Sequence, residues 1–81
     1  MKFRKEGRTR MKNPQVLFGK KLSMVRQERG LSPEKLAEMA GVSRNLLERV
    51  EHGKHNLTLN RIVDFAHALK VKPVELFELI P

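Results

Sequence analysis

The sequence predicts an all-α fold, and three observations support this prediction. Apolar residues recur at helical spacing, whereas alternation of apolar and polar residues persists nowhere for the length of a strand, and β-branched residues are sparse. Residues that typically begin or end helices separate the apolar segments at short intervals. We therefore expect a compact domain of five short helices over residues 13–81, preceded by a basic leader.

The first two helices are predicted from their start and stop residues. Asn13-Pro14 and Ser32-Pro33 each place a favoured N-cap before a proline, which lacks the amide hydrogen that the first helical turn leaves unpaired. Gly30 and Gly41 are the predicted stops, because glycine readily adopts the left-handed conformation that ends many helices. The residues expected to face the core from these helices are Val16, Phe18, Leu22, Val25, Leu36, Ala37 and Ala40.

A tight turn is predicted to join the second helix to a third, which Ser43 caps and Gly53 ends. Two helices joined so closely cross steeply and require small residues at the crossing, which Ala37 and Ala40 provide. The inward residues of the third helix are expected to be Leu47 and Val50. This arrangement predicts a helix-turn-helix, in which the third helix projects into a DNA major groove.

Thr58 is predicted to cap a fourth helix, which has the clearest amphipathic pattern in the chain. Its inward face is expected to consist of Leu59, Ile62, Val63, Ala66 and Leu69. Lys72-Pro73 is predicted to begin a fifth helix. The apolar residues of that helix are Val74, Leu76, Phe77, Leu79 and Ile80.

This last segment is more apolar than so small a domain needs. We expect part of it to cover the core and part to form a symmetric dimer. The candidate interface residues are Leu76, Leu79 and Ile80. The alternative is that the whole segment only closes the core.

The charge of the chain is strongly positive and unevenly distributed. The 17 Lys and Arg residues outnumber the 9 Asp and Glu residues, and the net charge of +8 predicts a polyanionic partner, nucleic acid before an anionic membrane surface. Residues 1–12 hold most of the excess and few large apolar side chains, so we expect this leader to be disordered by itself. It is either an arm that contacts phosphates or the minor groove of DNA, or a solvated tail.

The composition disfavours several classes of protein. The absence of cysteine excludes a disulfide scaffold and any zinc site with Cys ligands. No apolar run is long enough to span a membrane, and no apolar stretch follows the basic N-terminus as in a secretory signal. His52 and His55 lack a third ligand nearby in sequence, and no serine lies in a Gly-x-Ser-x-Gly context. We therefore expect a cytoplasmic protein without catalytic activity, cofactor or bound metal.

The third helix carries a polar face, which consists of Arg44, Asn45, Glu48, Arg49 and His52. An arginine can donate two hydrogen bonds to guanine O6 and N7, and an asparagine can pair in the same way with adenine N6 and N7. The alternative is a solvated helix face, the usual role of such residues. Glu48 lies one turn after Arg44 and is expected to pair with it, or else to accept from a cytosine amine.

The segment LSPEKLAEMAGVSRNLLERVEHGK resembles the Cro/CI-type (XRE-like) helix-turn-helix family of phage repressors and bacterial regulators. The flanking segments KKLSMVRQERG and LTLNRIVDFAHALKV extend the resemblance to residues 18–77. It implies a lambda-repressor-like DNA-binding domain. Within the family, the chain is similar to controller proteins of restriction–modification systems.

The resemblance also implies roles for individual residues. Base reading is implied for Arg44, Asn45 and Arg49. A structural ion pair that pins the recognition helix to the first helix is implied between Arg26 and Glu51.

Phosphate contacts are expected at two places. Ser43 should cap the third helix and leave its N-terminus aimed at a phosphate, and the resemblance implies further contacts in the following loop and helix start. The complete set of candidates is Ser43, Lys54, Asn56, Asn60 and Arg61. Many relatives carry a phosphate-binding glutamine at the position of Pro33, which has no donor for that contact.

The expected function is sequence-specific binding of double-stranded DNA by a transcriptional regulator, a repressor or an autoregulator. It would act as a homodimer on a near-palindromic operator, with half-sites about one helical turn apart. The alternative is an antitoxin-type protein that neutralises a toxin partner and autoregulates its operon. A neighbouring toxin gene and a co-purifying second chain would distinguish the alternative.

Overall fold

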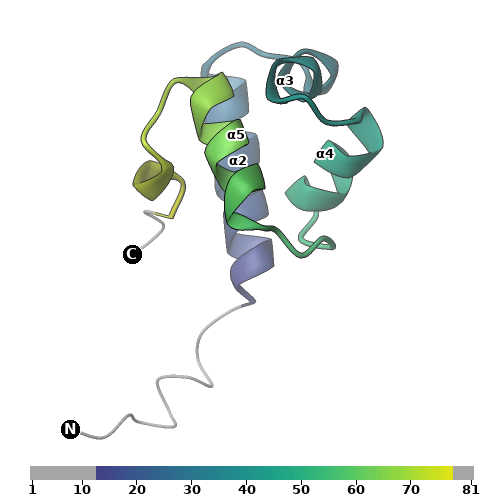
Figure 1. Ribbon diagram of the computed structural model, residues 1–81, viewed down its shortest axis with the longest axis vertical. Helices are drawn as coiled ribbons and strands as arrows, with labels where there is room; N and C mark the ends of the chain where they lie inside the picture. Colours follow the sequence, from purple (N-terminus) through teal and green to yellow (C-terminus); the bar gives the residue numbers. More distant parts are fainter. Residues whose placement is uncertain (1–12, 78–81) are drawn as a thin grey trace, which may run out of the picture.

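The computed structural model describes residues 13–77, which form four α-helices and a final 3-10 helix without any strand (Figure 1). The elements are α2 (Pro14–Glu28), α3 (Pro33–Ala40), α4 (Arg44–Glu51), α5 (Leu59–Leu69) and η1 (Pro73–Phe77). The predicted all-α class is confirmed. The fifth predicted α-helix is corrected to a 3-10 helix, the tighter form in which short helical segments are common. The predictions for the basic leader 1–12 and for Leu79 and Ile80 lie outside the described residues.

Each α-helix begins after a side chain that accepts a hydrogen bond from a backbone amide of the first turn. The four capping residues are Asn13, Ser32, Ser43 and Thr58, with donor–acceptor distances of 2.8 to 3.2 Å. These are the four residues that the sequence predicted as helix starts. Because the caps satisfy amides that have no partner within the helix, they fix where each helix begins.

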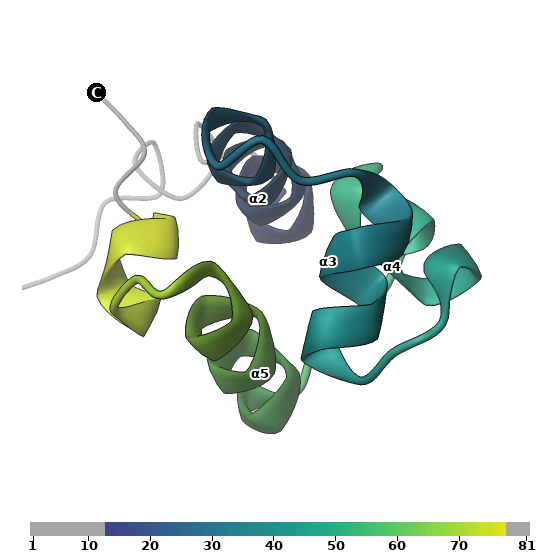
Figure 2. The same cartoon turned by 90° about the horizontal axis from the view of Figure 1, so that it is seen from above.

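The helices enclose one apolar core. In Figure 2, α2, α3 and α5 surround the centre of the domain, while α4 lies on the outer side of the α2–α3 corner and η1 lies beside α5. The buried residues are Phe18, Leu22, Val25, Leu36, Ala37, Ala40, Leu47, Val50, Phe65, Ala66, Ala68, Leu69 and Leu76. The predicted core of α3 and α4 is confirmed in full. In α2 it is confirmed except for Val16, which is half-buried.

The orientation of α5 differs from the prediction. Leu59 and Val63, expected to face inward, are 79% and 51% exposed, whereas Phe65 is 0% exposed. Two apolar stripes of helical spacing overlap on this helix, and they share Ala66 and Leu69. The helix is turned so that the larger ring of Phe65 occupies the core, which buries more apolar surface than Leu59 in the first turn would. The prediction for Leu59 and Val63 is therefore wrong.

Candidate nucleic-acid interface

Helices α3 and α4 form a helix-turn-helix through residues 41–43. Gly41 has the left-handed backbone angle φ of 75°, which lets the chain leave α3 and turn sharply. The amide of Val42 donates to the carbonyl of Ala37 at 2.9 Å and so closes the end of α3. Ala37 and Ala40 are 3% and 8% exposed, as expected of small residues at a helix crossing. Figure 1 shows α4 crossing below α3 at the edge of the domain.

Helix α4 has a buried face and a solvent face. Leu47 and Val50 are 0% and 1% exposed and anchor the helix to the core. All three residues predicted to read bases, Arg44, Asn45 and Arg49, are exposed. The structure thus brings them together on one helix with their side chains accessible to a ligand.

Two carboxylates from different helices flank the Arg44 guanidinium. Its Nε donates to Glu48 Oε2 at 3.0 Å, which is the intrahelical pair expected from the sequence. Its Nη1 donates to Glu34 Oε2 at 2.5 Å, and Glu34 lies in the first turn of α3. Glu34 is not among the candidates that the sequence indicates, because the contact depends on how the turn places the start of α3 beside the start of α4.

The C-terminal end of α4 is held by a second ion pair. Arg26 Nε donates to Glu51 Oε2 at 2.8 Å, and Arg26 Nη2 donates to Glu51 Oε1 at 3.3 Å. Arg26 Nη1 also donates to the carbonyl of Leu31 at 2.8 Å. The two charged side chains are only 11% and 12% exposed. The pair implied by the resemblance is therefore present, and it ties α4 to α2 and to the α2–α3 loop.

Gly19 allows α2 and α4 to approach closely. A Cβ atom at this position would lie 2.3 Å from the carbonyl oxygen of Val50 and 2.7 Å from that of Glu51. Both distances are far below van der Waals contact, so no other residue fits without moving a helix backbone. Gly19 is not among the predicted site residues, although a glycine inside a helix, where alanine is more favourable, indicates a packing reason.

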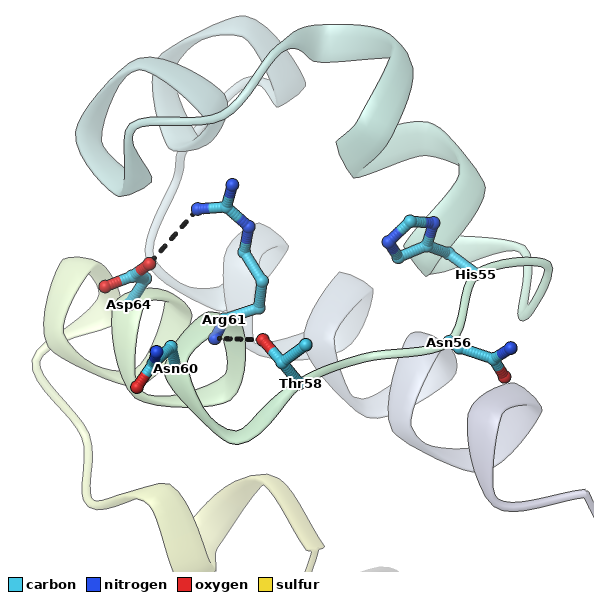
Figure 3. A pocket seen from close by; sticks show the side chains of 6 residues that line it. All are labelled: His55, Asn56, Thr58, Asn60, Arg61 and Asp64. Carbon is cyan, nitrogen blue, oxygen red and sulfur yellow. Dashed lines mark hydrogen bonds and ion pairs between the residues drawn. The ribbon is translucent and has the colours of Figure 1, made fainter.

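The phosphate candidates lie in two places. Ser43 caps α4, whereas the other four lie in the loop after α4 and in the first turns of α5. A shallow hollow there is lined by His55, Asn56, Thr58, Asn60, Arg61 and Asp64 (Figure 3). Lys54 precedes the hollow and is exposed. The structure therefore brings together Asn56, Asn60 and Arg61 but not Ser43.

Two of these candidates already have partners. Arg61 Nη1 lies 3.2 Å from Asp64 Oδ2, one turn further along α5. Asn56 points away from Arg61 in Figure 3, toward the start of α2, where its Oδ1 accepts from Gln15 Nε2. Arg61 is half-exposed, so a phosphate can reach its remaining donors.

The C-terminal prediction requires a correction. Leu76 is 0% exposed and belongs to the core of the single chain, so it is not available to the interface for which it was a candidate. The physical reason is that η1 lays this side chain against α2 and α5 to close the core. Val74 and Phe77 of η1 are instead 59% and 51% exposed, and the Phe77 ring also lies 5.3 Å from that of Phe18.

Two further features would indicate another function within residues 13–77, a metal-binding group and a helix that crosses a membrane. No three His, Asp or Glu side chains in this range are grouped so that they could hold a metal ion. The Nδ1 atom of His52 lies 2.7 Å from the carbonyl oxygen of Glu48 in its own helix. None of the helices in this range is both long and apolar enough to cross a membrane.

The fold and the exposed face of α4 together define a class, that of helix-turn-helix DNA-binding domains. The family profile described as "Helix-turn-helix" matches residues 22–76, more than half of the chain. The chain belongs to this family of DNA-binding transcriptional regulators.

Individual proteins of this family are similar to the chain over most of its length. The chain is 33% identical over 67 residues to the control protein C.BamHI of Bacillus amyloliquefaciens, which covers 82% of this chain and 83% of that protein. It is 35% identical over 60 residues to the uncharacterised HTH-type transcriptional regulator y4dJ of Sinorhizobium fredii, with 74% and 78% covered. The crystal structure of the restriction–modification controller protein C.AhdI from Aeromonas hydrophila superposes with a TM-score of 0.76 at 41% identity. That match covers 78% of this chain and 96% of the other.

Proposed function

We propose that this regulator reads the bases of a specific duplex DNA site with the exposed face of α4. The observation that carries the proposal is the placement of Arg44, Asn45 and Arg49 on the solvent side of the second helix of the motif. The opposite side of that helix is buried, and the Arg26–Glu51 pair fixes its end. A helix held in this way presents its donors at a constant position, which base recognition in the major groove requires.

The remaining polar residues position the domain on the DNA backbone. Arg61 and Lys54 supply charge for phosphates, while Asn56, Asn60 and the capped start of α4 at Ser43 supply neutral donors. These contacts set the register of α4 on the duplex and add salt-dependent affinity.

We propose further that the protein acts as a homodimer. Four exposed apolar side chains lie on two adjacent elements, α5 and η1, and these are Leu59, Val63, Val74 and Phe77. A second copy of the chain would cover them through a symmetric contact and place two α4 helices about 34 Å apart, in successive major grooves. The operator would then be near-palindromic.

The similarity to C.BamHI and C.AhdI supports a role in the transcriptional control of restriction–modification genes. In this proposal the protein has no catalytic activity and acts in the cytoplasm. The sign of regulation, repression or activation, follows from where the operator lies relative to the promoter.

Selection from a random duplex library with the purified full chain, at about physiological salt, tests the proposal. We expect an enriched motif with two-fold symmetry, and a loss of preference at one base pair of each half-site for Arg44→Ala. Absence of any motif, with binding that salt alone removes, would show only non-specific charge attraction. A second chain that co-purifies in place of a second copy would instead favour the antitoxin alternative.

The dimer has its own test. Val63→Glu places a charge on the proposed contact without touching α4. We expect sedimentation velocity to show a monomer for this variant and a dimer for the wild type. Lys20→Glu, an exposed position on α2, is the matched control and should remain dimeric. Equal masses for all three proteins would contradict the assignment of this face.

A further inference from the structure

The two carboxylates around Arg44 point to a role for Glu34 that base reading alone does not require. We propose that Glu34 is a specificity-determining residue, which prevents Arg44 from binding phosphates and leaves it able to bind base edges. The inference rests on the proposed function, because it concerns how the same surface discriminates between DNA sites.

The geometry of the guanidinium sets what remains available. An arginine has five N–H donors, one on Nε and two on each terminal nitrogen. Glu48 occupies the donor on Nε, and Glu34 occupies one donor on Nη1. Both donors of Nη2 and one of Nη1 remain, and two terminal nitrogens side by side match guanine O6 and N7. The two carboxylates therefore hold the plane of the Arg44 guanidinium and leave one of its edges free to bind a base.

The electrostatics of the cluster favour bases over phosphates. One guanidinium and two carboxylates carry a net charge of −1, so a phosphate is not attracted to the Arg44 guanidinium as it would be to an unpaired arginine. The nearest lysine on α3, Lys35, lies 3.9 Å from a different carboxylate, that of Glu38. The binding of a neutral base edge does not depend on this net charge and gains the hydrogen bonds of the free edge. Specificity of this kind arises from weakening the wrong complex rather than only strengthening the right one.

The exposure of the cluster makes the effect measurable without unfolding the protein. The side chains of Arg44, Glu34 and Glu48 are 52%, 60% and 46% exposed. Solvent screens such pairs, so breaking one affects folding little. Glu34→Gln keeps the size and the hydrogen-bonding ability of the side chain and removes its charge. Glu38→Gln makes the same change one turn further along α3, away from Arg44, and is the matched control.

The experiment uses two duplexes, the site that the wild-type full chain enriches from a random library and a scrambled duplex of the same composition. We expect Glu34→Gln to bind the scrambled duplex roughly five- to tenfold more tightly at about 0.1 M salt, with a salt dependence steeper by about one unit of slope. Affinity for the enriched site should change less than about twofold, so the ratio of the two affinities falls about five- to tenfold. The base pair at which Glu34→Gln loses its preference should be the same one at which Arg44→Ala loses it.

The control separates this effect from a general change of charge. Glu38→Gln should shift both affinities equally and leave their ratio unchanged. If Glu34→Gln also leaves the ratio unchanged, or relaxes a different base pair from Arg44→Ala, the inference is wrong while the proposed function stands. If the wild-type chain enriches no site at all, the proposed function itself is wrong. Thermal unfolding of each variant confirms that folded proteins are compared.

Discussion

The two ends of α4 use the same chemistry in opposite ways. At the C-terminal end, Arg26 and Glu51 pair at 11% and 12% exposure and join α4 to α2. At the N-terminal end, Arg44 pairs with Glu34 and Glu48 at 46% to 60% exposure. A charge buried without its partner is strongly unfavourable, whereas an exposed pair contributes about 1 kcal/mol or less. The difference teaches that one end of the helix is fixed by its buried ion pair, while the other holds its arginine in an exposed pair with donors still open to solvent.

Breaking the fixed end should have the largest effect. Glu51→Gln leaves the buried Arg26 guanidinium without a counter-charge, and we expect the free energy of unfolding to fall by about 3 kcal/mol. Urea denaturation measures this change. The double variant Arg26→Met with Glu51→Leu should recover much of the loss, because it removes both charges. A loss below about 1 kcal/mol for Glu51→Gln would place this pair with exposed ones and remove the contrast.

Gly19→Ala acts at the same end of α4 through packing rather than charge. The added Cβ meets backbone carbonyls, so α2 and α4 must separate, and we expect a loss of about 1–3 kcal/mol in urea denaturation. Because α4 itself is displaced, affinity for the enriched site should also fall in protein that is still folded. Lys20→Ala, at the exposed neighbouring position, should leave stability nearly unchanged. An unchanged affinity for folded Gly19→Ala would show that DNA binding tolerates the displacement of α4.

Arg44→Ala tests the exposed end of α4. We expect a loss of about 1–3 kcal/mol of discrimination at one base pair, since the proposed bidentate contact is removed. Fluorescence anisotropy with duplexes substituted at single base pairs measures this loss. Arg61→Ala should instead weaken binding to all of these duplexes about equally, as expected of a phosphate contact. The same base preference in both variants would leave Arg44 without a reading role.

The smallest expected effect gives the sharpest comparison. Glu48→Gln is the same substitution as Glu51→Gln, on the same helix and also beside an arginine, but at the exposed pair. We expect a change of less than about 0.5 kcal/mol in the free energy of unfolding, as for other exposed pairs one turn apart on a helix. Urea denaturation of the two variants side by side compares a buried pair with an exposed one, in which Arg44 also keeps Glu34 as a partner. Equal losses would show that burial does not set the energies of these pairs.

Much of the fold could be predicted from the sequence because its signals are local. The four capping residues, the helix-turn-helix and the core of α3 and α4 all follow from neighbouring residues. The orientation of α5 could not be predicted in this way. Two apolar stripes overlap on that helix, and only packing around Phe65 decides between them.

The candidate site was predictable to the same extent. The exposed face of α4 follows from helical periodicity, and Arg44, Asn45 and Arg49 lie on it. Glu34 could not be assigned, and Gly19 is marked in the sequence only as a glycine within a helix, because the partner of each is brought near by the tertiary fold. Contacts of this type depend on how helices cross, and spacing within one helix does not report it.

The close fit of Gly19 against α4 has a consequence for how such proteins diversify. The atoms that a Cβ at position 19 would meet are main-chain carbonyls, so the fit does not depend on which side chains α4 carries. Duplicated genes can therefore exchange the exposed residues at positions 44, 45 and 49 without refolding the scaffold. If α4 reads bases as proposed, substitutions at these three positions can change the operator, whereas we expect substitutions at position 19 to disturb the scaffold. A scaffold held by this helix contact can thus carry different exposed side chains on α4 while it keeps one architecture.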